Sequence, residues 1–375
     1  GRGKGRGAVW VERLVGSMRR VAARLARETA RSAWAPSLPV NSVHNRTLWN
    51  RSGELSREYD PRAIANYFRW RPLEVAGRAV RVAGELGFVG LRVLTRQGSV
   101  ESRAAHLRSA LTRLGPAFVK LGQVLSTRTD LIPAAVCREL ARLQDEMPVN
   151  VQHEVMVEHI ERELGRPVSA VFDHLPPGPI ACASLGLVYK ARLRGGRLVA
   201  VKVQRPRLGR TLALDALLLR GVAGWATRRF KLRTDLVAVT DELVGRIFEE
   251  ADFEREARHA MRFRELFAGA ESAGRGWTVI APEVLPEYST RTLLVLEWID
   301  GVKMTDRSGL KEAGLDANAI LEQGIRCSLH QLLEAGYMHA DPHPGNLLAS
   351  RSGDLVYLDF GSVIEVPHRE RLPPV

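Results

Sequence analysis

The sequence predicts an α+β fold in which two lobes follow an N-terminal helical extension. Residues 60–174 carry apolar side chains at helical spacing and show few strand signals. At residues 176–179, which read Pro-Pro-Gly-Pro, the period changes, and short apolar runs separated by turns follow. Near the C-terminal end a short apolar run separates two turn-rich loops with acidic residues. A content of 45% hydrophobic residues is ample for the core of such a fold.

These changes in period divide the chain into four segments. We expect a basic leader over residues 1–59, a helical extension over 60–175, a small lobe with a helical insert over 176–303, and the start of a large lobe over 304–375.

The charge balance limits the class of partner without identifying it. The formal net charge of +13 suits nucleic acid, anionic lipid or a polyphosphate ligand equally well, and solvated helical faces are the common alternative. The cysteines Cys137, Cys182 and Cys327 are far apart and lack metal-site spacing, which indicates a reduced compartment or simple burial. No run of about 18 apolar residues occurs, so no transmembrane helix is predicted within these residues.

The leader is rich in arginine and poor in acids, which is typical of an organelle transit segment. A surface helix with a flexible stretch is the alternative. A nucleic-acid-binding arm is disfavoured, because Trp10, Trp34 and Trp49 are too sparse to form a stacking platform. We therefore expect no nucleic-acid partner.

The helical extension places Lys120 and Gln123 three residues apart on one helical face, opposite an apolar face. Taken alone, Lys120 is expected to be a surface lysine. Residues 134–145 predict another amphipathic helix, which stops near Pro148.

The small lobe begins with a loop of small residues that enters a strand. The loop residues are Ala181, Cys182, Ala183, Ser184 and, at the start of the strand, Gly186. Two short strands around a turn, with Lys202 late in the second, would hold a nucleotide. The backbone amides of the loop would lie over the phosphates, and the Lys202 ammonium would reach the α- and β-phosphates. The alternative for Lys202 is a charge on an edge strand. Because each Cβ in the loop restricts its backbone, we expect a nucleotide geometry unlike that under a glycine-rich loop.

Two helices are expected from residue 207 onward, and the second ends in an acidic stretch over residues 249–257. Asp252 and Glu256 can share a helical face, whereas Glu250 and Asp252 cannot on a straight helix. Either the helix breaks near Ala251 or these carboxylates serve different partners, and one of them should pair with Lys202. A solvated acidic face is the alternative.

The apolar run 292–301, which contains Glu297 and Ile299, predicts a strand that leads into a hinge between the lobes. Backbone groups there would read the edge of adenine, and apolar walls would sandwich the ring. A helix over residues 317–335 then leads to the loop that carries Asp341.

Asp341, Asn346 and Asp359 supply the oxygen atoms that phosphoryl transfer with Mg²⁺ requires. Asn346 follows Asp341 by five residues, and Asp359 begins an Asp-Phe-Gly tripeptide 13 residues later, which is the protein-kinase spacing. We assign Asp341 as the base or the residue that orients the nucleophile, and Asn346 and Asp359 as Mg²⁺ ligands. A turn after a strand is the alternative for Asp-Phe-Gly by itself.

Together these residues resemble the UbiB, or ADCK, family of atypical protein-kinase-like proteins over about residues 100–365. Residues 120–123 are similar to the family's KxGQ signature, residues 181–184 to its alanine-rich loop, and residues 250–252 to its ExD motif. Glu256 stands where the family has the ion-pair partner of the nucleotide lysine.

The resemblance implies a bilobal protein-kinase-like fold that binds ATP with Mg²⁺ and hydrolyses it or transfers its γ-phosphoryl group. It also implies a lid over the active site, where Lys120 and Gln123 meet Glu250 and Asp252. The implied partners are isoprenoid-quinone or lipid biosynthetic proteins and a membrane surface, with a role in prenylquinone metabolism. Residues 126–133 are similar to plastid members, so a plastid is preferred, with a mitochondrion or a bacterial membrane as alternatives.

Three features depart from the family pattern. Leu187 stands where the family commonly has Gln, and His259 where it often has Asn. The chain ends 16 residues after Asp359, so we expect a truncated large lobe and look for activity in the full-length protein.

Other functions stay open. One is a nucleotide-binding pseudokinase that scaffolds a lipid-biosynthetic complex. Another is a small-molecule phosphotransferase similar to aminoglycoside kinases, although that function does not require residues 120–123. Nucleic-acid binding is the weakest alternative.

Overall fold

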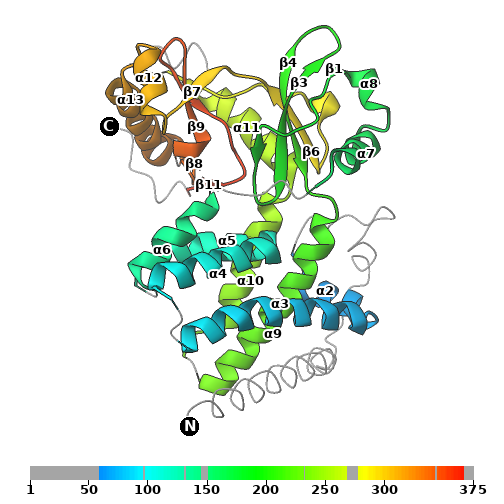
Figure 1. The fold of residues 1–375 in the computed structure, drawn as a ribbon. Helices are drawn as coiled ribbons and strands as arrows, with labels where there is room; N and C mark the ends of the chain where they lie inside the picture. Colours follow the sequence, from blue (N-terminus) through cyan, green and yellow to red (C-terminus); the bar gives the residue numbers. More distant parts are fainter. Residues whose placement is uncertain are drawn as a thin grey trace. The chain divides into compact units, whose positions relative to one another are not determined.

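The computed structural model describes residues 59–95, 98–130, 132–144, 151–231, 233–267, 278–342 and 344–366 (Figure 1). The chain forms two compact units: a helical unit from Gly1–Pro148 with Arg207–Phe248, and a sheet unit from Val149–Pro206 with Glu249–Val375. The segment expected as a helical insert of the small lobe therefore packs with the N-terminal helices. Apart from Tyr59, the expected leader lies outside the described residues.

The helical unit is built from long amphipathic helices. Its described helices are α2 (Pro61–Arg69), α3 (Pro72–Leu94), α4 (Val100–Leu114), α5 (Pro116–Ser126), α6 (Ala134–Ala141) with the 3₁₀ turn Arg142–Gln144, α9 (Leu208–Phe230) and α10 (Leu236–Glu250), whose last two residues belong to the sheet unit. Proline begins α2, α3 and α5, where the missing N–H costs nothing because the first helical N–H groups have no intrahelical acceptor. Within the described parts of the chain, no helix is both long and apolar enough to cross a bilayer.

The core of the helical unit lies between α4, α5 and α6. It contains Leu111, Leu114, Phe118, Val119, Leu140 and Leu143. Gly122 lies at the closest approach: a Cβ there would lie 2.5 Å from Cδ1 of Leu143 and 2.9 Å from Cδ1 of Leu111. Helix packing therefore explains the glycine between Lys120 and Gln123.

A buried ion pair joins α3 to α9. The Arg78 guanidinium contacts both carboxylate oxygens of Asp215, with Nε–Oδ1 2.7 Å and Nη2–Oδ2 2.8 Å. The Asp215 side chain is 0% exposed and that of Arg78 10%. Burial raises the pKa of Asp215 to about 6, although the hydrogen bonds and the positive charge of Arg78 act to lower it.

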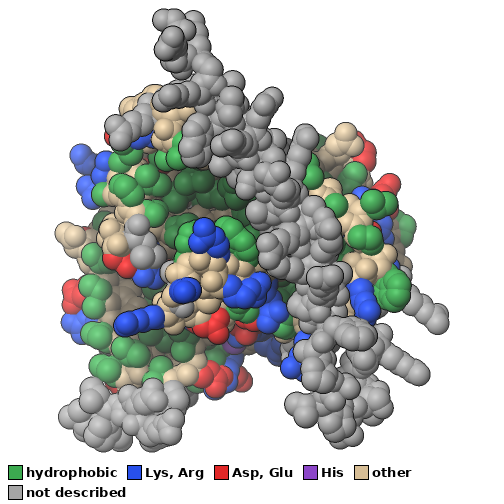
Figure 2. All heavy atoms as spheres, turned by 90° about the horizontal axis from the view of Figure 1, so that it is seen from below, with side chains coloured by type: hydrophobic (Ala, Val, Ile, Leu, Met, Phe, Trp, Pro, Cys, Tyr) green, Lys and Arg blue, Asp and Glu red, His purple; other side chains and the backbone are tan. Residues whose placement is uncertain are grey.

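The end of α9 combines basic and aromatic side chains. Arg228, Arg229, Phe230 and Lys231 are exposed, and the ring of Phe230 packs edge-on against Trp225 at 5.9 Å between centroids. Figure 2, which views the molecule from below Figure 1, shows Lys and Arg side chains among hydrophobic ones on this face. We refer to residues 225–231 as the basic tip of α9.

The sheet unit contains three sheets. The five-stranded sheet has β1 (Phe172–His174), β3 (Gly186–Leu193), β4 (Leu198–Gln204) and β6 (Leu293–Glu297) in that order, with β2 (Ala181–Cys182) paired to β3. The four-stranded sheet has the order β5 (Val279–Ile280), β10 (Leu355–Tyr357), β9 (Leu347–Ser350) and β7 (Gly301–Lys303). The third is an antiparallel ladder of β8 (Tyr337–His339) and β11 (Val363–Glu365).

Helices flank these strands in the sheet unit (Figure 1). They are α7 (His153–Leu164), α8 (Val168–Val171), α11 (Phe253–Phe267), α12 (Arg307–Glu312) and α13 (Ala317–His330), with 3₁₀ turns at Pro286–Tyr288 and Pro344–Asn346. α13 continues into a π-helical turn, Gln331–Ala335, which ends at Gly336. The expected helix over residues 317–335 is therefore confirmed, with a wider last turn.

The alternation of side chains along β4 determines to which face of the sheet Lys202 points. Val199, Val201 and Val203 are fully buried on one face of the sheet. Successive strand side chains point to opposite faces, so Lys202 lies on the other face together with Ala200, which packs against the core that contains α11. The chain also breaks between α10 and α11, as one of the two alternatives for residues 249–257 predicted.

Candidate nucleotide and metal site

Lys202 and Glu256 form a buried ion pair between β4 and α11. The Lys202 Nζ lies 2.7 Å from each carboxylate oxygen of Glu256. Glu256 is on the buried face of α11 with Phe253, Ala257 and Ala260, and its side chain is 2% exposed. Of the acids in residues 249–257, Glu256 is thus the one that pairs with the lysine.

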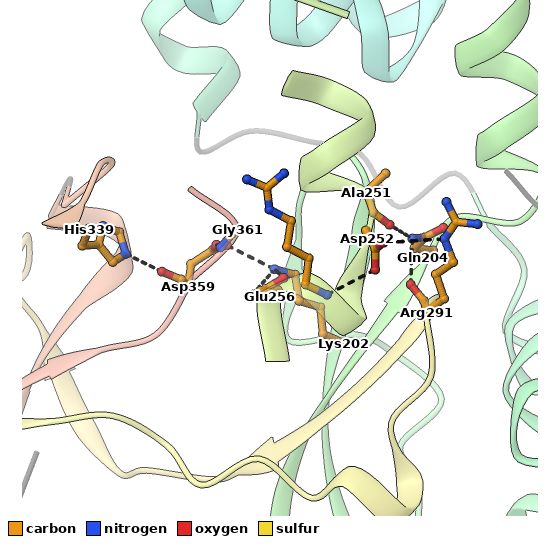
Figure 3. A network of polar contacts seen from close by, with 10 residues as sticks. Lys202, Gln204, Ala251, Asp252, Glu256, Arg291, His339, Asp359 and Gly361 are labelled. Carbon is orange, nitrogen blue, oxygen red and sulfur yellow. Dashed lines mark hydrogen bonds and ion pairs between the residues drawn. The ribbon is translucent and has the colours of Figure 1, made fainter. Parts of the chain in front are cut away.

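Asp359 brings a second carboxylate to the same ammonium (Figure 3). Its Oδ2 lies 3.2 Å from the Lys202 Nζ, and its Oδ1 accepts the Gly361 N–H at 2.9 Å. The Asp359 side chain is 40% exposed, against 15% for Lys202. Asp359 is therefore the most exposed member of the trio, which leaves it accessible to a ligand.

The charges of the trio stabilise the ammonium form of Lys202. Burial lowers the pKa of Lys202, but the charges of Asp359 and Glu256 outweigh burial and hold this pKa above its ordinary value. Burial raises the pKa of Glu256 to about 7; the charge of Asp359 adds to this shift and Lys202 opposes it. The lysine is therefore protonated at neutral pH, and the carboxyl groups of Glu256 and Asp359 share it.

His339 connects the loop of Asp341 to the backbone of Asp359. Its Nδ1 accepts the N–H of Asp341 at 3.2 Å, so the ring proton is on Nε2, which donates to the carbonyl oxygen of Asp359. The N–H of His339 donates to Oε1 of the buried Gln331 at 2.9 Å, within the π-helical turn. The sequence alone assigns no role to His339 or Gln331, because the wider turn that brings them together has no signal in the sequence.

Asn346 and Asp359 lie at the same end of the β9–β10 hairpin. Leu347 pairs with Tyr357, and the Leu358 N–H donates to the carbonyl oxygen of Asn346 at 3.1 Å. The register therefore brings together the segments that carry the two expected Mg²⁺ ligands. Asp341 is exposed on the preceding loop.

The donor chemistry of this end fits Mg²⁺ bound with a phosphate. One carboxylate and one amide oxygen suit a cation that keeps waters and takes other ligands from substrate phosphates. In the described residues no group of three or more His, Cys, Asp and Glu side chains lies close enough to hold a metal by itself.

The loop over residues 181–186 is a closed turn. The Ala183 N–H donates to the carbonyl oxygen of Gly186 at 2.9 Å, and Arg205 Nη2 donates to the carbonyl oxygen of Ala183 at 3.1 Å. Ser184 is buried, and Cys182 is partly buried, where burial raises the pKa of its thiol. The N–H of Ala183 thus points into the turn, which differs from the open amides of a glycine-rich loop.

Gly186 is required by close strand packing. A Cβ there would lie 2.7 Å from the carbonyl oxygen of Val203, a backbone atom that cannot rotate away. We expect Gly186→Ala to lower the free energy of unfolding of the sheet unit by about 1–3 kcal/mol, measured by urea denaturation. Gly178→Ala is the matched control, because a Cβ there meets nothing within 4 Å. Equal effects of the two substitutions would contradict this role.

The expected hinge begins at the end of β6. The Glu297 N–H donates to the carbonyl oxygen of Glu283 at 2.8 Å, and the Glu297 carboxylate accepts the Glu283 N–H at 3.1 Å. Ile299 follows, partly buried, on the connection to β7. Their contact with adenine stays a prediction.

The four expected lid residues belong to different units. In the helical unit, Gln123 Nε2 donates to the carbonyl oxygen of Leu143 at 2.8 Å, and Lys120 is on the same helix. In the sheet unit, the Asp252 carboxylate accepts the Arg255 N–H at 3.2 Å at the start of α11, and Glu250 lies beside Gly361. The meeting of the two pairs stays a prediction.

Comparison with known proteins gives the following matches. Residues 142–373 match the ABC1 atypical kinase-like domain. An uncharacterized protein of Synechocystis is 42% identical over 323 residues, which cover 84% of this chain and 46% of that protein. The Arabidopsis thaliana protein ACTIVITY OF BC1 COMPLEX KINASE 3, chloroplastic, is 41% identical over 321 residues, covering 84% of this chain and 44% of that protein. An uncharacterized aarF domain-containing protein kinase of A. thaliana, also chloroplastic, is 41% identical over 311 residues, which cover 81% of this chain and 43% of that protein. The chain spans about half the length of these curated relatives.

Proposed function

Because the chain belongs to the ABC1 atypical kinase-like family, which is the UbiB family, and has its kinase-like fold, we propose that the full-length protein binds ATP with Mg²⁺ and hydrolyses it or transfers its γ-phosphoryl group. The observation that carries the proposal is the convergence of Lys202, Glu256 and Asp359 on one ammonium.

The geometry gives each residue a role. Glu256 accepts two hydrogen bonds from the Lys202 ammonium. The third N–H is now directed to Asp359 and can donate instead to an α- or β-phosphate oxygen. Asp359 and Asn346 would hold Mg²⁺, which neutralises charge on the phosphates. Asp341 is placed on an exposed loop to orient the nucleophile or accept its proton.

Magnesium-dependent ATP turnover by the full-length protein tests the proposal. We expect Asp359→Asn to lower turnover by about 100-fold or more, because the loss of a metal-ligand charge weakens stabilisation of the transferring group by several kcal/mol. Asp354→Asn is the control, since Asp354 lies in the β9–β10 turn and accepts hydrogen bonds from Ser352 and from Thr278, which precedes β5. Equal rates for Asp359→Asn and the unaltered protein would refute the assignment.

Nucleotide binding without turnover would instead support the pseudokinase scaffold. In that case ATP affinity should survive Asp341→Asn and be lost in Lys202→Met. The two losses are separable, because Asp341 is exposed whereas Lys202 is bonded to Glu256 and Asp359.

We also propose a plastid location and a role in prenylquinone or membrane-lipid metabolism, with lipid-biosynthetic proteins as partners. The location is supported by relatives that are chloroplastic or from Synechocystis. Imaging of a fluorescent fusion of the full-length protein in plant cells tests it, and a mitochondrial signal would refute it.

The expected membrane partner is supported by the basic tip of α9, where cationic side chains surround an exposed aromatic ring. We expect co-sedimentation with phosphatidylglycerol vesicles, little with phosphatidylcholine vesicles, and loss of binding in Arg228→Glu/Arg229→Glu. Because exposed charges are screened by salt, 0.5 M NaCl should also release the protein. Unchanged binding by the charge-reversed variant would show that the tip is not the contact.

A further inference from the structure

α11 carries, within two turns after Glu256, two side chains that bond to the β8–β11 ladder. His259 Nδ1 lies 2.7 Å from the hydroxyl oxygen of Tyr337. The Arg262 guanidinium lies over the Tyr337 ring, 4.5 Å from its centroid, and Arg262 Nη1 lies 2.6 Å from Oε1 of Glu365. Glu365 and Tyr337 are directly paired in the ladder, so α11 contacts both strands at the same register position.

The hydrogen bonds of this cluster select one tautomer of His259. Arg255 Nε donates to His259 Nε2 at 3.2 Å, and a guanidinium can only donate. The ring proton is therefore on Nδ1 and is donated to the Tyr337 oxygen, and the Tyr337 hydroxyl donates in turn to the carbonyl oxygen of His259 at 3.4 Å. Each proton has one acceptor, so the cluster is complete with a neutral imidazole.

The surrounding charges keep that imidazole neutral. Burial lowers the pKa of His259, and the charges of Arg255, Arg258 and Arg262 on its own helix lower it further. Glu365, on the ladder, opposes this shift and is itself paired with Arg262. Tyr337 faces His259 as an uncharged phenol, because burial raises the pKa of its hydroxyl to about 12.

The strand that His259 grips also leads to the catalytic loop. Tyr337 is two residues before His339, which bonds to the Asp341 N–H and to the carbonyl oxygen of Asp359. On the helix side, His259 is three residues after Glu256, which holds Lys202. A displacement of α11 away from β8 would therefore move Glu256 relative to both Lys202 and Asp359.

We propose that His259 and Tyr337 are positioning residues that pin α11 to β8, so that Glu256 meets Lys202 before any nucleotide binds. This inference rests on the nucleotide binding proposed above. It gives this chain a fixed α11 whose position needs no separate activating event. The pin uses one donor and one acceptor of the imidazole, and an Asn side chain also supplies one of each.

Steady-state ATP turnover of the full-length protein tests the pin, with Tyr337→Phe, His259→Leu and His259→Asn. We expect Tyr337→Phe and His259→Leu to raise KM for ATP about three- to tenfold, the effect of one neutral hydrogen bond, with a smaller change in kcat. His259→Asn should stay within about twofold of the unaltered protein. Tyr288→Phe, a partly buried tyrosine in the turn Pro286–Tyr288, is the matched control and should change neither constant.

The pH profile provides a readout that a merely structural role would not change. At acid pH a protonated His259 would carry a second N–H directed at Arg255, so ATP affinity should fall in the unaltered protein and stay level in His259→Asn. Parallel profiles for the two proteins would contradict the pin.

Hydrogen exchange of the α11 amides, measured without nucleotide, separates failure of the pin from failure of the proposed function. Faster exchange over Phe253–Phe267 in Tyr337→Phe, with α13 unchanged, supports the pin. Unchanged exchange, or faster exchange with an unaltered KM, overturns it. If the unaltered protein binds no ATP, the proposed function fails, and the exchange result alone decides whether α11 is pinned.

Discussion

Replacing Lys202 by methionine should lower ATP affinity by at least about tenfold, because a charge-assisted hydrogen bond to phosphate contributes about 1.5–3 kcal/mol. The variant should still fold. Methionine replaces the aliphatic stem in the buried space, and Glu256, whose pKa burial already raises to about 7, can take up a proton once its cation is gone. Displacement of a fluorescent ATP analogue from the full-length protein measures the effect.

Lys190→Met is the matched control for this prediction. Lys190 is on β3 of the same sheet, 36% exposed, and pairs with Asp300 at 3.5 Å. Its loss should leave ATP affinity within about twofold. The double variant Lys202→Met/Glu256→Gln should restore stability lost in Lys202→Met without restoring affinity, and equal affinities of Lys202→Met and Lys190→Met would remove the basis of the nucleotide site.

Replacing Asp215 by alanine should destabilise the helical unit by about 3–5 kcal/mol, because the guanidinium of Arg78 would stay buried without its partner. Urea denaturation followed by circular dichroism at 222 nm measures the change. Glu242→Ala is the control: Glu242 pairs with Arg246 on the surface, with side-chain exposures of 67% and 73%, and its loss should cost less than about 0.5 kcal/mol. Equal losses would show that the pair is not what holds α3 to α9.

The same carboxyl predicts a pH dependence of stability. The pKa of Asp215 rises from an ordinary 3.8 to about 6 on folding, so between these values the native state binds more protons than the unfolded state. The free energy of unfolding should therefore fall as pH rises from about 4 to 6 and level off above that. Asp215→Asn lacks this carboxyl and should lack this component, which urea denaturation of both proteins at pH 4, 5 and 7 will show.

Much of the candidate site could be predicted because its chemistry requires particular residue types at short spacings. Asp341, Asn346 and the Asp-Phe-Gly at 359 are close in sequence, and a hairpin register then aligns them. Which acid pairs with Lys202 could not be decided from helical spacing alone. The decision depends on the break between Glu250 and Phe253, which sets the phase of α11 and turns Glu256 toward the core.

Contacts between segments far apart in the chain leave no pattern of short spacings in the sequence. Arg78 and Asp215 are 137 residues apart, and His259 and Tyr337 are 78 apart, so neither pair appears in any local period. The grouping of α9 and α10 with the N-terminal helices was likewise hidden, because their apolar spacing fits any apolar neighbour. The place of this helical insert along the chain could be predicted, but not the unit with which it packs.

The chain leaves the sheet unit after Pro206 and re-enters it at Glu249. The side chain of Gln204, at the end of β4, donates to the carbonyl oxygen of Ala251, just before α11. The points of exit and re-entry are thus within reach of one side chain. The two places where the sheet unit is interrupted, after Pro206 and before Glu249, are therefore close together, so β4 and α11 stay adjacent although residues 207–248 intervene in the sequence.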